Sequence, residues 1–347
     1  MDRIKIISPA DEAAIFASKA RWNGVAKPLG SLGLFEEQIT KIAGIIGSAD
    51  VDLSKRAAVV MCADNGVVCE NVTQSPSDVT AVVAKAVVEG TSNINIMANC
   101  FNTQTIAVDV GMNVDVSGTL RRKTAYGTQN IAVGAAMTEE QAKSAICAGM
   151  DVVRDLSENG VKIIISGEMG IGNTTTAAAV SCILLNKTPD EITGRGAGLT
   201  SEGLERKIAV IKRAIEVNKP QKDNPLDILA KLGGFDIAGM AGLFLGGAVY
   251  RVPVVIDGVI SAASAAIAAE ICPLCRDFML ASHTSEEPAA KGLLEKLNLK
   301  APINAGLRLG EGTGAVLLLP LLDAALAVYN SSHRFSELPI EQYMELK

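Results

Sequence analysis

The chain has 347 residues, of which 48% are hydrophobic and only 3% aromatic, and it carries a formal net charge of -6 with a pI near 5.2. This length supports either one large core or a main domain with a smaller one beside it. The acidic balance argues against a protein that binds nucleic acid through a basic face.

The amino terminus lacks the basic and apolar segments of a signal peptide, so we expect a cytoplasmic protein. The longest uncharged apolar stretch, residues 237–250, is shorter than the roughly 18 residues of a membrane span, and we predict a buried helix there.

The seven cysteines lie mostly in apolar surroundings, which favours reduced, buried thiols. Cys272 and Cys275 have the spacing of a metal or redox pair. No second pair accompanies them, so we interpret them as structural.

Strand and helix patterns alternate along most of the chain. Short β-branched runs predict strands at residues 57–63, 105–108, 162–165, 252–256 and 278–281. Helical patterns occupy residues 79–98, 139–156, 173–185, 201–217 and 260–271. This alternation predicts an α/β fold, a doubly wound, Rossmann-like parallel sheet with helices on both faces.

The two ends of the chain have helical patterns. The segment 27–33 breaks the pattern of the first 50 or so residues, and a long helix interrupted at Pro320 is predicted over residues 313–329. We expect a small helical domain formed from residues 1–49 plus 313–347, beside an α/β domain of residues 50–312.

Each predicted strand ends at or near a polar residue: Asp64, Asp109, Glu168, Asp257 and the pair Ser282-His283. In parallel sheets ligands bind outside the carboxyl ends of the strands, so we expect these side chains along one rim. An aspartate after a strand also commonly caps the next helix, which is an alternative explanation for each one taken alone.

Two glutamates flanked by glycine are the strongest indication of an active site. Glu168 lies in the segment GEMGIGNTT at 167–175, and Glu311 lies in GEGTG at 310–314. A carboxylate is costly to bury without partners, and flanking glycines let a ligand approach the backbone closely. Glu311 is next to apolar Leu309, so we expect it to be partly desolvated, with a raised pKa that suits a general base.

The turn that follows Glu168 predicts an anion site, because free N–H groups at a helix start favour negative charge. A second glycine cluster, 194–198, precedes a helix that carries Lys207, a candidate phosphate ligand. An ordinary entry into a helix is the alternative for each turn; the presence of Glu168 makes it the weaker explanation for the first. Neither has the spacing of a dinucleotide or nucleoside-triphosphate loop. With only His283 and His333 in the chain, we predict no metal site.

Taken together, several segments resemble the nicotinate-nucleotide:dimethylbenzimidazole phosphoribosyltransferases: 27–33, 63–67, 167–175, 194–199, 257–261 and 310–315. The matches follow the family's order from about residue 27 to 325. The resemblance implies transfer of the phosphoribosyl group of nicotinate mononucleotide to a lower-ligand base of cobamides, giving an α-linked riboside 5'-phosphate and free nicotinate. It also implies no metal and no cofactor, no nucleic-acid or membrane partner, and a homodimer or a heterodimer with a related subunit.

The resemblance also implies roles for individual residues. Glu311 matches the general base, and Glu168 would align the nucleotide. The nucleotide and its phosphate would be bound by Gly170, Gly172, Asn173, Gly196, Lys207, Ser285, Gly312 and Gly314. The acceptor pocket would contain Asp64, Ser75 and Leu309.

Two departures from the family pattern concern the acceptor. Asn71 stands where glycine is common, and the segment 287–289 differs after Ser285 and Glu286. The acceptor therefore stays open among benzimidazole, purine, phenol and p-cresol. A phenol with a pKa of about 10 would also need a base, so Glu311 would serve either kind of acceptor. Two further alternatives are a non-catalytic partner subunit and a Rossmann oxidoreductase, although the latter lacks its dinucleotide motif.

Overall fold

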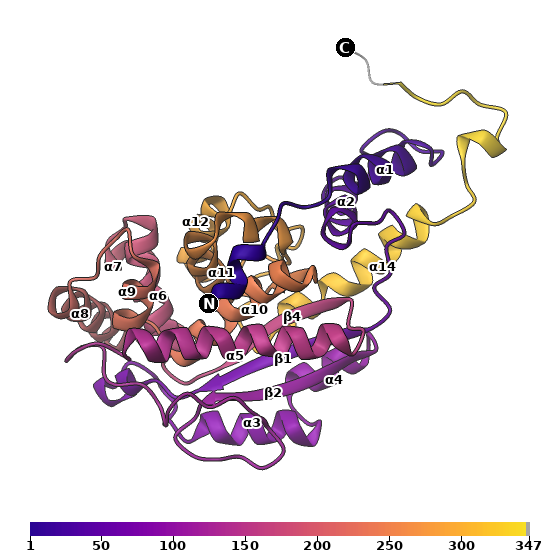
Figure 1. Cartoon of the computed structure of the whole chain (residues 1–347). Helices are drawn as coiled ribbons and strands as arrows, with labels where there is room; N and C mark the ends of the chain where they lie inside the picture. The colour runs from indigo at the N-terminus through magenta and orange to yellow at the C-terminus, as the bar shows by residue number, and fades with distance from the viewer. Residues whose placement is uncertain (345–347) are drawn as a thin grey trace.

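The computed structural model describes residues 1–344 and is built around one six-stranded parallel sheet (Figure 1). The strands are β1 (Arg56–Ala63), β2 (Thr103–Gly111), β3 (Leu120–Arg121), β4 (Ile163–Met169), β5 (Val254–Ile256) and β6 (Met279–Ala281). Their order is β3-β2-β1-β4-β5-β6, and every neighbouring pair is parallel. The predicted doubly wound α/β fold is confirmed, with the order of strands reversing between β1 and β4.

Alternate residues of the strands supply the two halves of the core. Along β1, Val59 and Met61 belong to one hydrophobic cluster, whereas Val60 and Cys62 belong to a second. Successive side chains of a strand point to opposite faces, so a run that is apolar throughout is buried on both sides. This explains why β1 has no polar alternation in its sequence.

Four predicted helices appear with nearly the predicted bounds: α5 (Glu139–Glu158), α6 (Asn173–Leu185), α8 (Ser201–Asn218) and α11 (Val259–Ile271). The apolar stretch 237–250 is the buried helix α10 (Phe235–Tyr250), as predicted. No helix among residues 1–344 is long and apolar enough to cross a membrane. Short helices without a predicted counterpart are α7 (Pro189–Ile192), α9 (Pro225–Leu232) and α12 (Ala289–Lys296).

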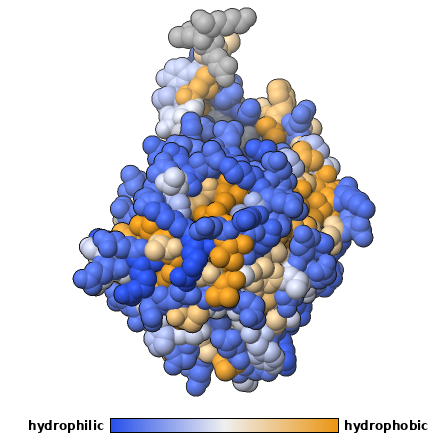
Figure 2. All heavy atoms as spheres, turned by 90° about the vertical axis from the view of Figure 1, so that its left-hand side faces the viewer, coloured by the Kyte–Doolittle hydropathy of each residue, from blue (hydrophilic) through white to orange (hydrophobic). Residues whose placement is uncertain are grey.

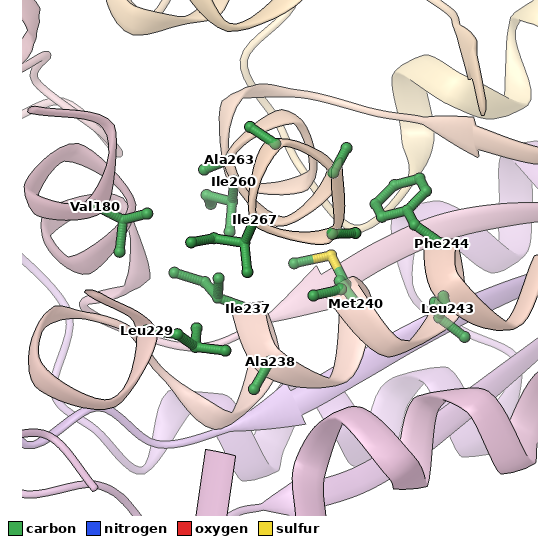
Figure 3. Packing of buried hydrophobic residues seen from close by; sticks show 14 of the residues in the cluster. Val180, Leu229, Ile237, Ala238, Met240, Leu243, Phe244, Ile260, Ala263 and Ile267 are labelled. Carbon is green, nitrogen blue, oxygen red and sulfur yellow. The ribbon is translucent and has the colours of Figure 1, made fainter. Parts of the chain in front are cut away.

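Helix α10 lies at the centre of the larger core cluster. Figure 3 shows Ile237, Met240 and Phe244 of this helix packed beside residues of α11, among them Ile267. On its other side α10 crosses α5 so closely that a Cβ on Gly149 would overlap the backbone of α10. Glycine at this position therefore allows the two helices to approach at backbone distance.

Two predicted helices are divided in the structure. The pattern at 79–98 forms α3 (Val79–Glu89) and α4 (Asn93–Asn99), because Gly90 is left-handed and Ser92 caps the second helix. The pattern at 313–329 forms α13 (Thr313–Val316) and α14 (Leu318–Tyr329). The break lies at Leu317 rather than at Pro320. A proline ring clashes with the carbonyl four residues earlier, so its effect appears one turn upstream.

Helices from both chain ends pack together, as Figure 1 shows for α1 (Glu12–Asn23), α2 (Leu34–Ile46) and α14. The rings of Trp22 and Tyr329 lie 4.8 Å apart between centroids. The first residues instead contact the α/β part, where Arg3 pairs with Asp151 of α5 at 2.7 Å. The division into two domains with the bounds given above stays a prediction.

The cysteines are less uniformly buried than expected. All seven are free thiols; Cys62, Cys182 and Cys275 are buried, whereas Cys69 and Cys100 are exposed. The two exposed residues lie in a 3-10 turn and at the end of α4, where the chain is at the surface.

Candidate active site

A cleft of about 250 Å³ lies at the carboxyl ends of β4, β5 and β6. Its walls come from the segments that follow these strands, from the start of α6, and from the loop at 308–311. Figure 2 shows the side of the molecule that carries α7 and α8, where hydrophobic residues gather in the middle of the face within a hydrophilic surround. The predicted gathering of polar residues holds for Glu168, Asp257 and His283, which all line the cleft. Asp64 and Asp109 follow or belong to β1 and β2, outside this cleft.

Glu168 is the second-last residue of β4 and is buried, with 8% of its surface exposed. Its Oε2 accepts a hydrogen bond from Nδ2 of Asn173 at the start of α6. Burial raises the pKa of Glu168 to about 8, and the nearby carboxylates of Asp236, Asp257 and Glu311 act in the same direction. At neutral pH this side chain is therefore mainly protonated.

Glu311 lies in a turn of three consecutive left-handed residues, with φ values of 89° at Gly310, 60° at Glu311 and 93° at Gly312. Glycine adopts this conformation freely, whereas for glutamate it costs about 1–2 kcal/mol. The turn directs the carboxylate to α4, where the backbone N–H of Ile94 donates to Oε2 over 3.3 Å. Burial raises the pKa of Glu311, as the sequence predicted, while the hydrogen bond from Ile94 opposes the rise.

Asp257 holds the turn that carries Glu311. Its carboxylate accepts hydrogen bonds from the backbone N–H of Gly312 at 3.2 Å and of Ala315 at 2.9 Å. The Nδ1 atom of His283 lies 4.0 Å from Oδ1 of Asp257. Burial raises the pKa of Asp257 and lowers the pKa of His283. The sequence placed Asp257 at the end of a strand but assigned it no role in the site.

The two glutamate motifs are in direct contact. A Cβ on Gly310 would lie 2.6 Å from Oε1 of Glu168, and the φ of Gly310 is 89°, so both the contact and the backbone favour glycine here. The structure thus places the two carboxyl groups in one cleft, although 143 positions separate them in the sequence (311 minus 168).

Most of the predicted nucleotide ligands lie on or directly behind the cleft wall. Gly170, Asn173, Gly196 and Ser285 line it. The fully buried Lys207 lies behind the wall and donates from Nζ to Oγ1 of Thr174 at 2.9 Å.

Two electrostatic features distinguish this wall. Burial lowers the pKa of Lys207 to about 8, and the charge of Glu287 opposes that shift. The N–H of Gly196 donates to Oε1 of Glu287 at 2.9 Å, so this predicted phosphate donor already has an acceptor. A phosphate would therefore compete with Glu287 for the N–H of Gly196.

Other predicted residues do not reach the cleft. Ser75 and Gly172 line a neighbouring pocket of about 90 Å³ that shares the wall 170–174. Asp64 accepts hydrogen bonds from Ser77 at 2.6 Å and from the backbone N–H of Asn113 at 2.7 Å, which ties its own loop to the segment that follows β2.

Two predicted glycines serve the Asp257 network. The N–H of Gly312 is bonded to Asp257, and Gly314 packs against His283 so closely that it has no room for a side chain. Their roles in nucleotide binding stay predictions.

The cleft residues that sequence reasoning missed include three with polar side chains, Thr174, Glu287 and Arg308. Leu309, predicted for the acceptor pocket, lines the cleft and is 55% exposed. Arg308 beside it is exposed, and within residues 1–344 its guanidinium makes no hydrogen bond or ion pair. Nothing in its sequence neighbourhood marked it, because a single arginine in a loop is usually only a solvated charge.

Comparison with known proteins decides the family. A phosphoribosyltransferase family model matches residues 7–340. The chain belongs to this phosphoribosyltransferase family. It is therefore a pentosyl-transferring enzyme, as the resemblance implied, and the oxidoreductase alternative is wrong.

Curated relatives extend over nearly the whole chain. The nicotinate-nucleotide--dimethylbenzimidazole phosphoribosyltransferase of Clostridium acetobutylicum is 41% identical over 99% of this chain and 98% of its own length. The enzyme of the same name from Ruminiclostridium cellulolyticum is 44% identical over 95% of this chain and 94% of its own length. Among solved structures, CobT from Thermus thermophilus superposes with a TM-score of 0.88 at 36% identity, covering 95% of this chain and 100% of that one.

Proposed function

We propose that this phosphoribosyltransferase moves the phosphoribosyl group of nicotinate mononucleotide to dimethylbenzimidazole, a step in building the lower ligand of cobamides. The proposal is supported by the names of its full-length relatives. The single structural observation that carries it is the joint placement of Glu168 and Glu311 in one cleft beside the start of helix α6.

The reaction is a displacement at C1' of the ribose, in which one bond forms and one breaks. A ring nitrogen of the benzimidazole bonds to C1' of the ribose from the face opposite the nicotinate, which inverts the anomeric carbon. The bond between C1' and the pyridinium nitrogen breaks, and its electron pair neutralises that nitrogen. The N–H proton of the acceptor passes to the carboxylate of Glu311. The leaving group is already cationic, so the enzyme mainly has to position the reactants and accept one proton.

The two glutamates suit different parts of this reaction. Glu311 is half-buried and has a raised pKa, which makes it a stronger base than an exposed carboxylate. Glu168 is more deeply buried and its pKa is raised to about 8, so at neutral pH it can donate a hydrogen bond to a ribose hydroxyl. Enzymes commonly place two acids in different environments, so that one is ionised and acts as a base while the other stays protonated and donates a hydrogen bond.

The test is an assay of the purified chain with nicotinate mononucleotide and, in separate reactions, dimethylbenzimidazole, adenine, phenol and p-cresol. Mass spectrometry of the ribosylated product identifies both the reaction and the acceptor. We expect α-linked dimethylbenzimidazole riboside 5'-phosphate and one nicotinate per product. Absence of nicotinate release with every acceptor would overturn the proposal and would favour a non-catalytic partner subunit. Product with the phenols alone would reassign the acceptor.

We also propose that the active form is a homodimer, one of the two assemblies that the family resemblance implies. Light scattering on the purified chain tests this, because a heterodimer subunit isolated alone would give the mass of a single chain.

A further inference from the structure

The cleft carries an uneven charge. Four carboxyl groups line it: Glu168, which is mainly protonated at neutral pH, and Asp257, Glu287 and Glu311. Arg308 is the only arginine or lysine on its described wall. An anionic group that enters next to these acids would be repelled unless a cation is close to it. The guanidinium of Arg308 is exposed and has no hydrogen bond or ion pair with any of residues 1–344, so it is available for that purpose.

Nicotinate mononucleotide has two anionic groups, its phosphate and the carboxylate of the pyridine ring. Lys207 lies behind the wall formed by Thr174 and Gly196, which is where we expect the phosphate to bind. Arg308 belongs instead to the loop that carries Glu311, the side where the reacting carbon must lie. We infer that Arg308 binds the carboxylate of the nicotinate leaving group, and this inference rests on the proposed function.

The chemistry makes this contact stronger as the reaction proceeds. In the bound nucleotide, the positive pyridinium nitrogen partly offsets the ring carboxylate. When the bond to C1' breaks, that nitrogen becomes neutral and the carboxylate loses its internal counter-charge. The attraction to Arg308 therefore increases toward the transition state, and an interaction of this kind raises kcat rather than only lowering KM. Nicotinamide mononucleotide has no carboxylate and gains nothing from the contact.

The experiment compares wild type with Arg308→Gln and Arg308→Lys, using nicotinate mononucleotide and nicotinamide mononucleotide as donors with dimethylbenzimidazole as acceptor. We expect Arg308→Gln to lower the ratio of kcat/KM for the two donors by about 10- to 100-fold, the range for losing a charged hydrogen bond. The loss should fall mainly on kcat for the nicotinate donor, with little change for the nicotinamide donor. Arg308→Lys should lie between, because lysine keeps the charge but not the planar fork.

Arg121→Gln is the matched control. Arg121 is exposed on β3, far along the sheet from the cleft, and its partner Asp115 is 3.5 Å away in an exposed pair. This variant should keep the wild-type donor ratio. Thermal unfolding should be unchanged in Arg308→Gln, because the side chain has no partner to lose.

The donor ratio of Arg308→Gln tests the role of Arg308, whereas nicotinate release by wild type tests the proposed function. If wild type uses nicotinate mononucleotide and Arg308→Gln has an unchanged donor ratio, the inference is wrong while the proposed function stands. An equal fall for both donors would show a structural role and would also overturn it. If wild type releases no nicotinate, both fail. As an independent measurement, calorimetry should show that Arg308→Gln binds free nicotinate about tenfold or more weakly than wild type, while nicotinamide binding is unchanged.

Discussion

Gly167 of β4 lies directly against the backbone of Glu311. A Cβ on Gly167 would overlap the carbonyl oxygen of Glu311 and lie 3.1 Å from the amide nitrogen of Gly312. The turn that presents one carboxylate is therefore seated on the strand that presents the other. Any displacement at this contact shifts Glu311 relative to Glu168.

We expect Gly167→Ala to lower kcat severely and to destabilise the fold by about 1–3 kcal/mol, the usual range for overpacking a tight site. Both clashing atoms are backbone atoms, so no side-chain rotation relieves the contact. Thermal unfolding and steady-state kinetics measure the two effects. Gly134→Ala is the matched control, because a Cβ there meets nothing within 4 Å. Wild-type kcat in Gly167→Ala would show that the turn tolerates displacement.

The sequence predicted the sheet and the pairing of Glu168 with Glu311, but not the contact that fixes their relative position. The sequence predicted the parallel sheet because β1, β4 and β5 are apolar runs between helical patterns. It also predicted that Glu168 and Glu311 share a site, since both are flanked by glycine. It did not reveal that Gly167 is fixed by contact with Glu311, because that contact depends on how the last loop returns to the sheet.

Two of the predicted site residues, Asp64 and Gly196, have hydrogen-bond partners that the sequence did not reveal. The sequence shows which groups can donate or accept a hydrogen bond but not which partners they have. Asp64 follows a strand as Asp257 does, yet Asp64 bonds to Ser77 and Asn113, whereas Asp257 holds the turn that carries Glu311. The N–H of Gly196 was expected to be free for phosphate and instead bonds to Glu287. Partners of this kind become visible only with the tertiary structure.

Glu311→Gln should lower kcat by about 10²- to 10⁴-fold, the contribution typical of a general base. The dissociation constant for nicotinate mononucleotide should change little, because glutamine keeps the size and the hydrogen bond from Ile94. In wild type, burial raises the pKa of Glu311 above the ordinary 4.5, so activity should rise with pH through a value higher than that. Stopped-time assays over a pH series measure this. Glu89→Gln, a change at an exposed glutamate on α3, is the control; an unchanged kcat in Glu311→Gln would remove it as the base.

Glu168 should make folding stability depend on pH. The pKa of Glu168 is raised to about 8 in the folded protein and is near 4.5 when unfolded, so between these values the folded state holds the proton more tightly. Its contribution to the free energy of unfolding is therefore complete below about 4.5 and is lost as pH rises toward 8, by an amount on the order of a few kcal/mol. Glu168→Gln removes this titratable group. The free energy of unfolding of wild type minus that of the variant, measured by denaturant titration, should therefore decline as the pH rises across that range. A constant difference would show that the carboxylate is ionised throughout.

Lys207 should make the affinity for the nucleotide decrease as the pH rises through the pKa of this lysine. Burial lowers the pKa of Lys207 to about 8, so the ammonium is charged below that pH and neutral above it. We expect the dissociation constant for nicotinate mononucleotide to increase as pH rises through 8, because the phosphate then loses its cation. Lys207→Gln should weaken binding about 10- to 100-fold at pH 7 and abolish this pH dependence. Calorimetric titrations at pH 6, 7, 8 and 9 give both effects, with Lys291→Gln on the exposed face of α12 as the control for removing a positive charge. If Lys207→Gln binds as tightly as wild type, the lysine serves only to hold Thr174 in place.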